Sequence, residues 1–411
     1  MFRLLKITKN TFLRILIGVL LLGCSDSLNN EEICIVDYEK EYPVMNLKLS
    51  DIADIFYIQL GGADSVKLLS SPSSFSNKIY IDDDYILIGD FLPYIYDGEW
   101  HRFSPQNAKL LMFNSKGEYL RTILKTYPSD SGMIFHGMET HFEVSSNKKV
   151  IYAYSGNGQF IREFDFSGKI IKDNKCSLKK FSDIVLIGDT LALFDLDAQK
   201  IRNNGEFRDD GACIKFYNAI LGNFLQHPGH HFQKPYDIRN SHAPEKITKV
   251  NGGIYITTPR TDTVYHLNDN LCISPSFLSV RYKDDVDNLT YPLVETEDYI
   301  LFCNVQDPLS YRNKVYDNAN YLYLKAEKQI YRLPCSNTFP ENGEEILWKD
   351  EFLLGCTYTT LTPNTLAVIL PISLLKEKYN LLPDKLKSMS SSASESDNHI
   401  LMVIKFGKAL P

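Results

Sequence analysis

Apolar and polar residues alternate in short runs along most of the chain, and the runs end at turns that contain glycine or polar residues. The clearest case is residues 113–121, which align with residues 164–172: each has an apolar strand end, a turn at Gly117 or Gly168, and a second strand. Two such runs joined by a tight turn are typical of a β-hairpin. The pattern therefore predicts a repeated hairpin.

The strand end that opens this hairpin recurs along the chain. We place it at Phe113, Phe164, Phe216, Leu267, Leu333 and Phe406, with successive spacings of 51, 52, 51, 66 and 73 residues. A second hairpin of apolar strands around a short polar turn precedes each position. These hairpins occupy residues 79–88, 142–154, 184–194, 247–257, 293–302 and 359–369. Each repeat is therefore expected to hold four strands.

Six repeats of four strands predict an all-β protein, a six-bladed β-propeller of four-stranded antiparallel blades. Closing the ring protects the strand edges that an open sheet would expose. Two stacked β-sandwiches would explain the strands but not the regular spacing. We assign the propeller to residues 41–411.

The amino end differs from the repeats. Residues 1–14 contain four basic residues and no acidic residue, and an apolar run at 15–22 leads to Gly23 and Cys24. This layout predicts a signal peptide at residues 1–23, because the apolar run is shorter than the roughly 20 residues that span a bilayer. The end of the run resembles the bacterial lipobox, so we expect Cys24 to carry a lipid. The alternative is an ordinary signal peptide that contains a cysteine.

Residues 24–40 then form the lipidated amino terminus and a tether, and the lipid bilayer becomes a partner through acylated Cys24. We expect the protein to be located in the bacterial cell envelope, at the outer membrane. The sequence does not decide between its periplasmic and its outer side. Loss of residues 1–23 removes four of 44 basic residues and leaves 40 against 51 acidic ones, a formal charge of −11. Nucleic acid is not an expected partner of so acidic a protein.

The segments 49–60, 83–87, 113–121 and 396–401 resemble those of six-bladed propeller lipoproteins of Bacteroidetes, which are distantly similar to NHL-repeat propellers. The resemblance covers nearly the whole mature chain. Its motifs mark strands and turns, and it implies no assigned activity. One departure is the segment 125–132, where members often have a Gly-Pro-Gly-Glu-type loop.

Seven cysteines follow Cys24, at widely spaced positions and without a Cys-x-x-Cys pair. This spacing does not indicate a zinc or redox site. We expect several of them to be small buried residues within strands. The pairing of any two cysteines stays open.

An antiparallel four-stranded blade places its first and third turns at one end and its remaining links at the other. The short turns therefore share one face, and we expect them to be structural. The long segments share the opposite face, where binding residues concentrate on rigid scaffolds. These segments are 91–107, 125–141, 195–212, 226–245, 303–320 and 370–398.

Candidate ligand-binding residues lie in the first and fifth of these long segments. Tyr94, Tyr96, Trp100 and His101 belong to an aromatic run, and Arg312 lies in residues 303–320. Aromatic side chains stack on sugar rings and anchor protein interfaces. The alternative is that the aromatic side chains pack over the first blade.

The nearest pattern to a metal site is His230, His231 and His242. Imidazole is a good zinc ligand, but neighbouring histidines point different ways and no helical H-x-x-x-H spacing orients them. We expect no cofactor. Should a metal bind, these three residues are the candidates.

The leading hypothesis is an envelope-anchored binding module that holds a glycan, peptide or protein partner through its long-loop face. The sequence has no G-x-S-x-G elbow, P-loop or zinc-binding helix, so we favour binding over catalysis. The rival is a propeller-type hydrolase or lyase, in which His, Asp and Arg residues from several blades converge near the central channel.

Overall fold

The computed structural model describes a little over half of the chain. The described residues are 34–37, 40–47, 49–61, 78–90, 109–125, 140–155, 160–175, 183–194, 214–221, 223–225, 246–257, 262–280, 288–306, 319–333, 357–370, 372–377, 379–382, 384–393 and 399–410.

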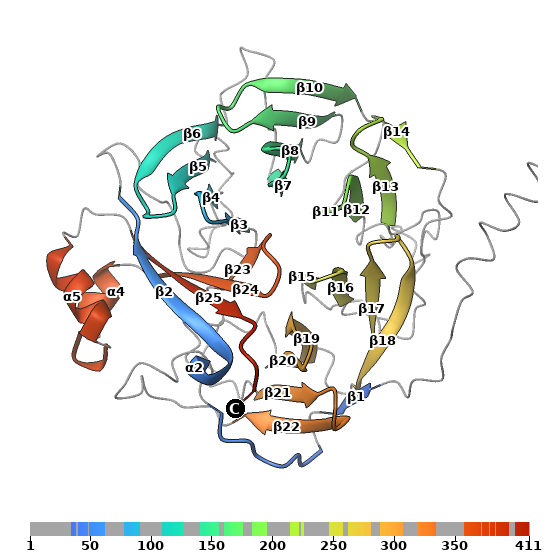
Figure 1. Cartoon of the computed structure of the whole chain (residues 1–411), viewed down its shortest axis with the longest axis vertical. Helices are drawn as coiled ribbons and strands as arrows, with labels where there is room; N and C mark the ends of the chain where they lie inside the picture. The colour runs from blue at the N-terminus through green and yellow to red at the C-terminus, as the bar shows by residue number, and fades with distance from the viewer. Residues whose placement is uncertain are drawn as a thin grey trace, which may run out of the picture.

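The strands in this part of the chain form six antiparallel blades of four strands each, arranged in a ring (Figure 1). Blade 1 consists of β3 (Lys78–Ile81), β4 (Tyr85–Asp90), β5 (Lys109–Asn114) and β6 (Tyr119–Lys125). Blade 2 consists of β7 (Thr140–Ser145), β8 (Val150–Ser155), β9 (Phe160–Asp165) and β10 (Ile170–Lys175). Blade 3 consists of β11 (Asp183–Ile187), β12 (Thr190–Phe194), β13 (Ile214–Asn218) and β14 (Asn223–Phe224).

Blade 4 consists of β15 (Lys246–Val250), β16 (Gly253–Thr257), β17 (Thr263–Asn268) and β18 (Ile273–Val280). Blade 5 consists of β19 (Asn288–Glu295), β20 (Tyr299–Gln306), β21 (Ala319–Leu324) and β22 (Gln329–Leu333). Blade 6 consists of β23 (Thr357–Thr360), β24 (Thr365–Leu370), β25 (Ile400–Phe406) and β2 (Ala53–Gln59). The predicted six-bladed β-propeller is confirmed.

All six predicted first hairpins are present, because each pairs the first two strands of a blade. One repeat position was wrong. Leu333 ends β22, the fourth strand of blade 5, whereas the third strand is β21 (Ala319–Leu324). Third and fourth strands can both show regularly spaced apolar residues, so the pattern does not say which of the two a run represents.

The fourth strand of blade 6 comes from the other end of the chain. β2 pairs antiparallel with β25 over seven residue pairs, from Ala53 with Phe406 to Gln59 with Ile400. The amino-terminal segment therefore closes the ring by hydrogen bonds to the last strand. Blades 6 and 1 also join at the axis, where β23 pairs parallel with β3.

The segment before β2 follows the outer rim of the ring. β1 (Cys34–Asp37) pairs parallel with β18, the outer strand of blade 4. Val44 then bridges to Arg332 on the outer strand of blade 5, and α2 (Leu49–Ile52) leads into β2 of blade 6. The stretch expected to be a tether thus contains, at Cys34–Asp37, a strand of the propeller sheet.

A hydrophobic cluster fills each interface between neighbouring blades in the described residues. On β11, Val185 and Ile187 pack toward blade 4, whereas Ile184 and Leu186 pack toward blade 2. Successive side chains of a strand point to opposite faces, so a strand between two blades is apolar at nearly every position. Burial of each such side chain contributes roughly 1.5–3 kcal/mol.

Short helices connect β24 to β25 on the outside of blade 6 (Figure 1). They are α4 (Ile372–Glu377), η3 (Tyr379–Leu381) and α5 (Asp384–Ser392). Ile372, Leu375 and Leu386 are buried in the cluster that joins blades 5 and 6. The helix α4, which begins at Ile372, therefore packs on the ring.

Candidate functional site at the mouth of the channel

The inner strands line the central channel and all run in the same direction. β3, β7, β11, β15, β19 and β23 lie nearest the axis, and each leads into a short turn (Figure 1). The last residues of these strands therefore lie at the channel mouth beside the short turns, and the first residues lie at the opposite end. A position within an inner strand thus gives a depth in the channel.

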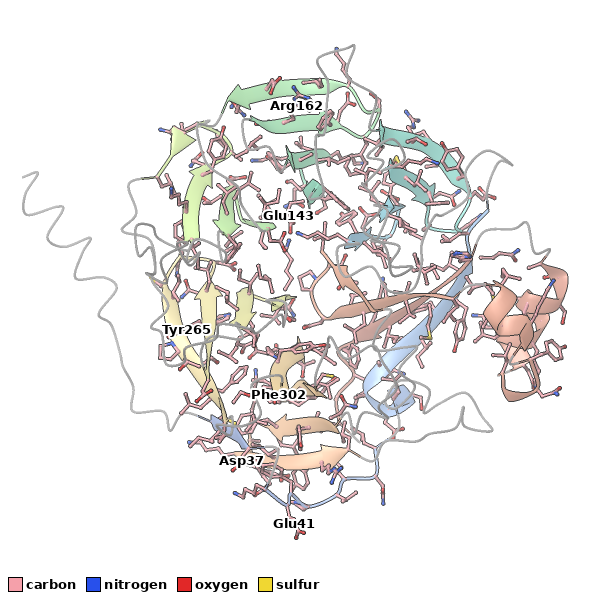
Figure 2. All side chains as sticks on the ribbon, turned by 180° about the vertical axis from the view of Figure 1, so that it is seen from behind. Asp37, Glu41, Glu143, Arg162, Tyr265 and Phe302 are labelled. Atoms are coloured by element: carbon pink, nitrogen blue, oxygen red, sulfur yellow. The ribbon has the colours of Figure 1, made fainter. Side chains whose placement is uncertain are left out.

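An ion pair lies near the short-turn mouth. Lys249 on β15 donates from Nζ to Oε2 of Glu143 on β7, at 3.0 Å. Blade 3 lies between these strands, so the pair crosses part of the channel. The Glu143 side chain is 1% exposed, and Figure 2 shows this residue on the inner side of the ring. Its Oε1 has no hydrogen-bond partner, which is costly for a buried carboxylate.

A second ion pair lies at the other end of the inner strands. Lys78, the first residue of β3, donates from Nζ to Oδ1 of Asp183 at 2.5 Å and to the carbonyl oxygen of Ile184 at 3.0 Å. The backbone N–H of Ile184 also donates to Asp183 Oδ1, at 2.6 Å. This pair joins blades 1 and 3, and blade 2 lies between them.

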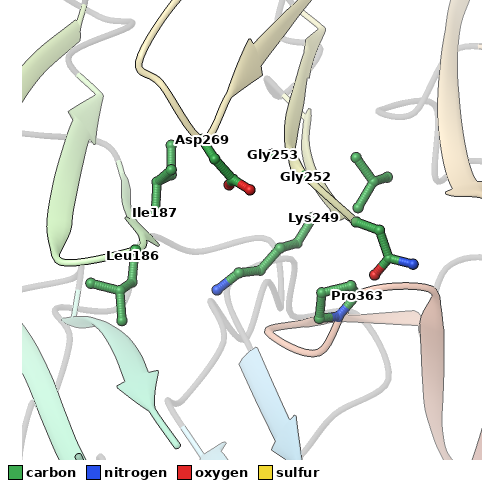
Figure 3. Close-up of a pocket in the computed structure, with 10 residues that line it drawn as sticks. Leu186, Ile187, Lys249, Gly252, Gly253, Asp269 and Pro363 are labelled. Carbon is green, nitrogen blue, oxygen red and sulfur yellow. The ribbon is translucent and has the colours of Figure 1, made fainter. Parts of the chain in front are cut away.

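A pocket of about 240 Å³ opens beside Lys249 at the short-turn mouth (Figure 3). We call it the axial pocket. Its residues come from blades 3, 4 and 6. The apolar part of its wall is formed by Leu186, Ile187, Val250 and Pro363, and the polar part by Lys249, Asn251 and Asp269. The pocket therefore combines a hydrophobic wall with both hydrogen-bond donors and acceptors.

Glycine at position 253 shapes the wall of the axial pocket. Its φ is 151°, a conformation that other residues rarely adopt. A Cβ at this position would collide with the backbone carbonyl oxygen of Leu267 and would lie 3.0 Å from Nε2 of His266. Gly253 thus permits the close approach of β16 and β17 behind the pocket. Gly252, with φ of 81°, has open space around the position of a Cβ.

A hydrogen-bond network joins blades 4, 5 and 6 next to the axial pocket. The Tyr255 hydroxyl donates to Oε2 of Glu295 at 2.8 Å, and Lys325 Nζ donates to Oε1 of Glu295 at 2.6 Å. The backbone N–H of Glu295 donates to Oδ1 of Asn364 at 3.1 Å. Both oxygens of the Glu295 carboxylate are thus satisfied, in contrast to Glu143.

Histidine 266 packs against this network. Its ring lies 5.0 Å from that of Tyr255, and its Nε2 is buried without a hydrogen-bond partner. Burial lowers the pKa of His266 below its ordinary value, although the nearby carboxylates of Glu295 and Asp269 act in the opposite direction. Burial, and then the charge of Glu295, raises the pKa of Tyr255. His266 is therefore held neutral near pH 7.

The candidate residues predicted from the sequence all lie outside the described residues. They are Tyr94, Tyr96, Trp100, His101 and Arg312 on the long-loop face, the histidines His230, His231 and His242, and Cys24. Each stays a prediction. Among the residues that the structure does describe, no three His, Cys, Asp or Glu side chains are placed to hold a metal ion.

The run of three aspartates after β3 has the structural role that its position predicted. Asp82 Oδ1 accepts hydrogen bonds from the backbone N–H groups of Asp84 and Tyr85, at 2.8 and 2.6 Å. Asp82 Oδ2 accepts a hydrogen bond from the Tyr80 hydroxyl at 2.7 Å. The aspartate thus orders the β3–β4 turn. Likewise Cys303 is fully buried within a strand, as expected for a small apolar residue.

Glu143 and Lys249 were not among the predicted site residues. The signal for Glu143 is a charged residue between the apolar residues Phe142 and Val144, because charged residues are rarely buried unless they are paired. Lys249 has no such signal, since its strand also contains Lys246. The sequence does not say, however, that the partner of Glu143 lies on β15, more than a hundred residues away.

Comparison with known proteins shows likeness in structure. No protein-family model and no curated protein matches the sequence. A putative exported protein from Bacteroides fragilis superposes with a TM-score of 0.60 at 15% identity, covering 91% of this chain and all of that one. A member of the DUF4221 family from Bacteroides vulgatus gives a TM-score of 0.49 at 9% identity, covering 87% and 99%. The first likeness shows a shared propeller fold.

The fold and site define the class of protein: a six-bladed β-propeller with a polar pocket at the mouth of its channel. Within the described part of the chain, no helix has the length and apolar character needed to cross a membrane.

Proposed function

We propose that this protein is a lipid-anchored binding module of the bacterial cell envelope, which captures a small ligand in the axial pocket. The observation that carries the proposal is the pocket itself. It lies at the axis of a rigid ring, and beside it the Lys249–Glu143 pair keeps one buried carboxylate oxygen without a donor. Concave sites with an apolar wall and a few converging polar groups are typical of small-ligand sites.

The proposed location in the cell envelope rests on the amino-terminal sequence. The signal-peptide pattern leads to Cys24 as the lipid-accepting residue, and a Bacteroides fragilis protein of the same fold is described as a putative exported protein. The resemblance of the sequence to Bacteroidetes propeller lipoproteins favours the outer membrane as the proposed location. Multiple acyl chains would hold the protein at the membrane, since a single chain binds only marginally.

Ligand capture is tested by a screen followed by calorimetry. The purified mature protein is screened by thermal shift against small sugars, amino acids and short peptides, and each compound that raises the melting temperature is titrated. Product analysis after prolonged incubation separates the two functions: an unchanged ligand supports a binding module, and a cleaved or eliminated product supports the hydrolase or lyase.

A bulky substitution locates the site. Asn251→Trp places an indole in the wall of the axial pocket and is expected to weaken binding at least about tenfold by excluding the ligand. Asn270→Trp is the matched control: Asn270 is exposed on the β17–β18 turn of the same blade and does not line the pocket. Equal loss of binding in both variants would contradict the axial site.

The long-loop face supplies a competing location. Trp100→Ala and Tyr96→Ala are expected to leave the affinity of the axial pocket unchanged. If these variants abolish binding while Asn251→Trp does not, the protein is still a binding module, but the ligand binds where the aromatic run predicted.

The anchor has its own test. In a Bacteroides host, wild-type protein is expected to incorporate a palmitate analogue and to fractionate with membranes. Cys24→Ser should lose the label and should not be processed as a lipoprotein. A labelled Cys24→Ser protein would show that Cys24 is not the acceptor.

A further inference from the structure

The polar groups at the axial pocket indicate which chemical class of ligand it would bind. Lys249 Nζ carries three N–H bonds, and the hydrogen bond to Glu143 Oε2 uses one of them. The Lys249 side chain lines the pocket and is 18% exposed, whereas its partner Glu143 is 1% exposed and does not line the pocket. A donor with unused N–H bonds thus lies directly next to Glu143 Oε1, an acceptor with no donor.

Charged ligand groups fit this arrangement poorly. An anionic group that accepts from Lys249 would lie near the Glu143 carboxylate, and Asp269 adds a second negative charge to the wall. An ammonium group that donates to Glu143 would lie beside the Lys249 ammonium. Like charges at such separations repel strongly where water is excluded. A hydroxyl group, in contrast, accepts from Lys249 and donates to a carboxylate without introducing a charge.

The shape of the pocket restricts the ligand further. A volume of about 240 Å³ is below the roughly 300–1,000 Å³ of pockets that hold drug-sized ligands, so one ring is the appropriate size. Leu186, Ile187 and Pro363 form an apolar part of the wall, which suits the C–H face of such a ring (Figure 3). Asn251 and Asp269 add polar groups to the lining.

We infer that the axial pocket binds a neutral, hydroxyl-bearing ring, a single saccharide unit, whose hydroxyl groups bind the Lys249–Glu143 pair. This inference rests on the proposed binding function and gives it a ligand class. Glu143 does not itself line the pocket, so a ligand hydroxyl reaches its Oε1 only if the Lys249 side chain rotates away from it. The bound sugar then supplies the donor that this buried oxygen lacks in the free protein.

The first test varies the charge of the ligand at constant ring size. The mature wild-type protein is titrated calorimetrically with methyl glucoside and methyl galactoside as neutral probes, glucosamine as the cationic probe and glucuronate as the anionic probe. At least one neutral glycoside is expected to bind about tenfold tighter than either charged sugar. Tighter binding of glucuronate or glucosamine would overturn the inference.

The second test changes the charge of the protein. Glu143→Gln leaves Lys249 without its counter-charge, so the affinity for glucuronate is expected to rise about tenfold relative to the neutral glycoside. Asp183→Asn is the matched control, because it makes the same chemical change in the other ion pair, away from the axial pocket. The Asp183→Asn variant should prefer the neutral glycoside over glucuronate to the same extent as the wild type.

The outcomes separate this inference from the proposed function. If no sugar binds but another compound binds and is displaced by Asn251→Trp, the axial binding site stands and the saccharide assignment is wrong. If a sugar binds equally well to the wild type and to Glu143→Gln with unchanged charge preference, the role of the ion pair is wrong. Should Glu143→Gln fail to fold, as seen by circular dichroism, the wild-type charge series decides alone.

Discussion

Two ion pairs in the same channel show how one kind of contact can serve different purposes. Lys78–Asp183 and Lys249–Glu143 each join inner strands that have another blade between them. Lys78 donates to both a carboxylate and a backbone carbonyl, and Asp183 Oδ1 also accepts from the backbone. Glu143, although more deeply buried than Asp183, keeps one oxygen without a partner next to a pocket.

The difference lies in hydrogen bonding and surroundings rather than in charge. Removing two charges from water is costly, and a buried ion pair offsets the cost only when further hydrogen bonds satisfy its atoms. The Lys78–Asp183 pair meets that condition more fully, which is consistent with a structural contact between blades. The Lys249–Glu143 pair meets it incompletely beside the axial pocket, which is consistent with a binding site.

The largest expected effect is that of Lys249→Met. It leaves the Glu143 carboxylate buried without a counter-charge, and loss of one partner of a buried pair costs about 3–5 kcal/mol. Urea unfolding followed by circular dichroism measures the change.

The control for this prediction is the double variant Lys249→Met with Glu143→Gln. It removes both charges at similar volume, so most of the lost stability is expected to return. A double variant as unstable as Lys249→Met alone would mean that packing of the lysine chain, and not its charge, is what the strand requires.

The second-largest loss of stability is expected for a substitution at Gly253, in the wall of the axial pocket. Gly253→Ala is expected to cost about 3 kcal/mol, because the new Cβ collides with the Leu267 carbonyl and the φ of 151° is unfavourable for alanine. Gly252→Ala has the backbone penalty without the collision and should cost only about 1 kcal/mol. Similar thermal unfolding of the two variants would contradict this account of the pocket wall.

A smaller loss is expected for Lys78→Met. The Asp183 side chain is 21% exposed and keeps its hydrogen bond from Ile184, so solvent offsets part of the unpaired charge. The cost should be about 2 kcal/mol, between the values typical of exposed and buried pairs. Ligand affinity should not change. Weaker ligand binding in Lys78→Met would show that the two pairs do not act separately.

The smallest effect is on acid stability and involves neither ion pair. Burial lowers the pKa values of His266 and His399 in the folded protein, so below about pH 6.5 the unfolded chain binds more protons than the folded one. Their contribution to stability is full above that pH and declines as the pH falls toward the folded pKa values. The melting temperature should therefore fall on going from pH 7.5 to pH 5.5.

His266→Asn tests the source of this acid effect, because asparagine is polar, smaller and does not titrate in this range. The variant should show a shallower decline of melting temperature with acid than the wild type, whatever its stability at pH 7.5. An unchanged slope would place the acid sensitivity elsewhere.

The repeat pattern predicted the fold because a propeller is built from local contacts. The first two strands of each blade are joined by a short turn, so the hairpins at residues 79–88 and 247–257 could be located from alternation and turn residues alone. The mistake at Leu333 arose in blade 5, where β21 and β22 both contain apolar residues in alternation. Pattern identifies a strand but not its place in the blade.

Contacts between distant parts of the chain followed no such local signal. The closure of blade 6 by β2 and the path of Cys34–Asp37 along blade 4 join residues separated by more than two hundred positions. In the same way, Glu143 is visible in the sequence as a charge between the apolar residues Phe142 and Val144, but its pairing with Lys249 is decided by the ring.

The sequence by itself thus determined the first hairpin of each blade, the number of repeats and the signal-peptide pattern that ends at Cys24, because each depends on neighbouring residues. Only the tertiary structure decided which strand closes the ring, which charges meet across the channel and where a pocket opens. The physical reason is that ring closure brings six inner strands to one axis. A carboxylate there has its partners fixed by that geometry and not by its neighbours in the chain.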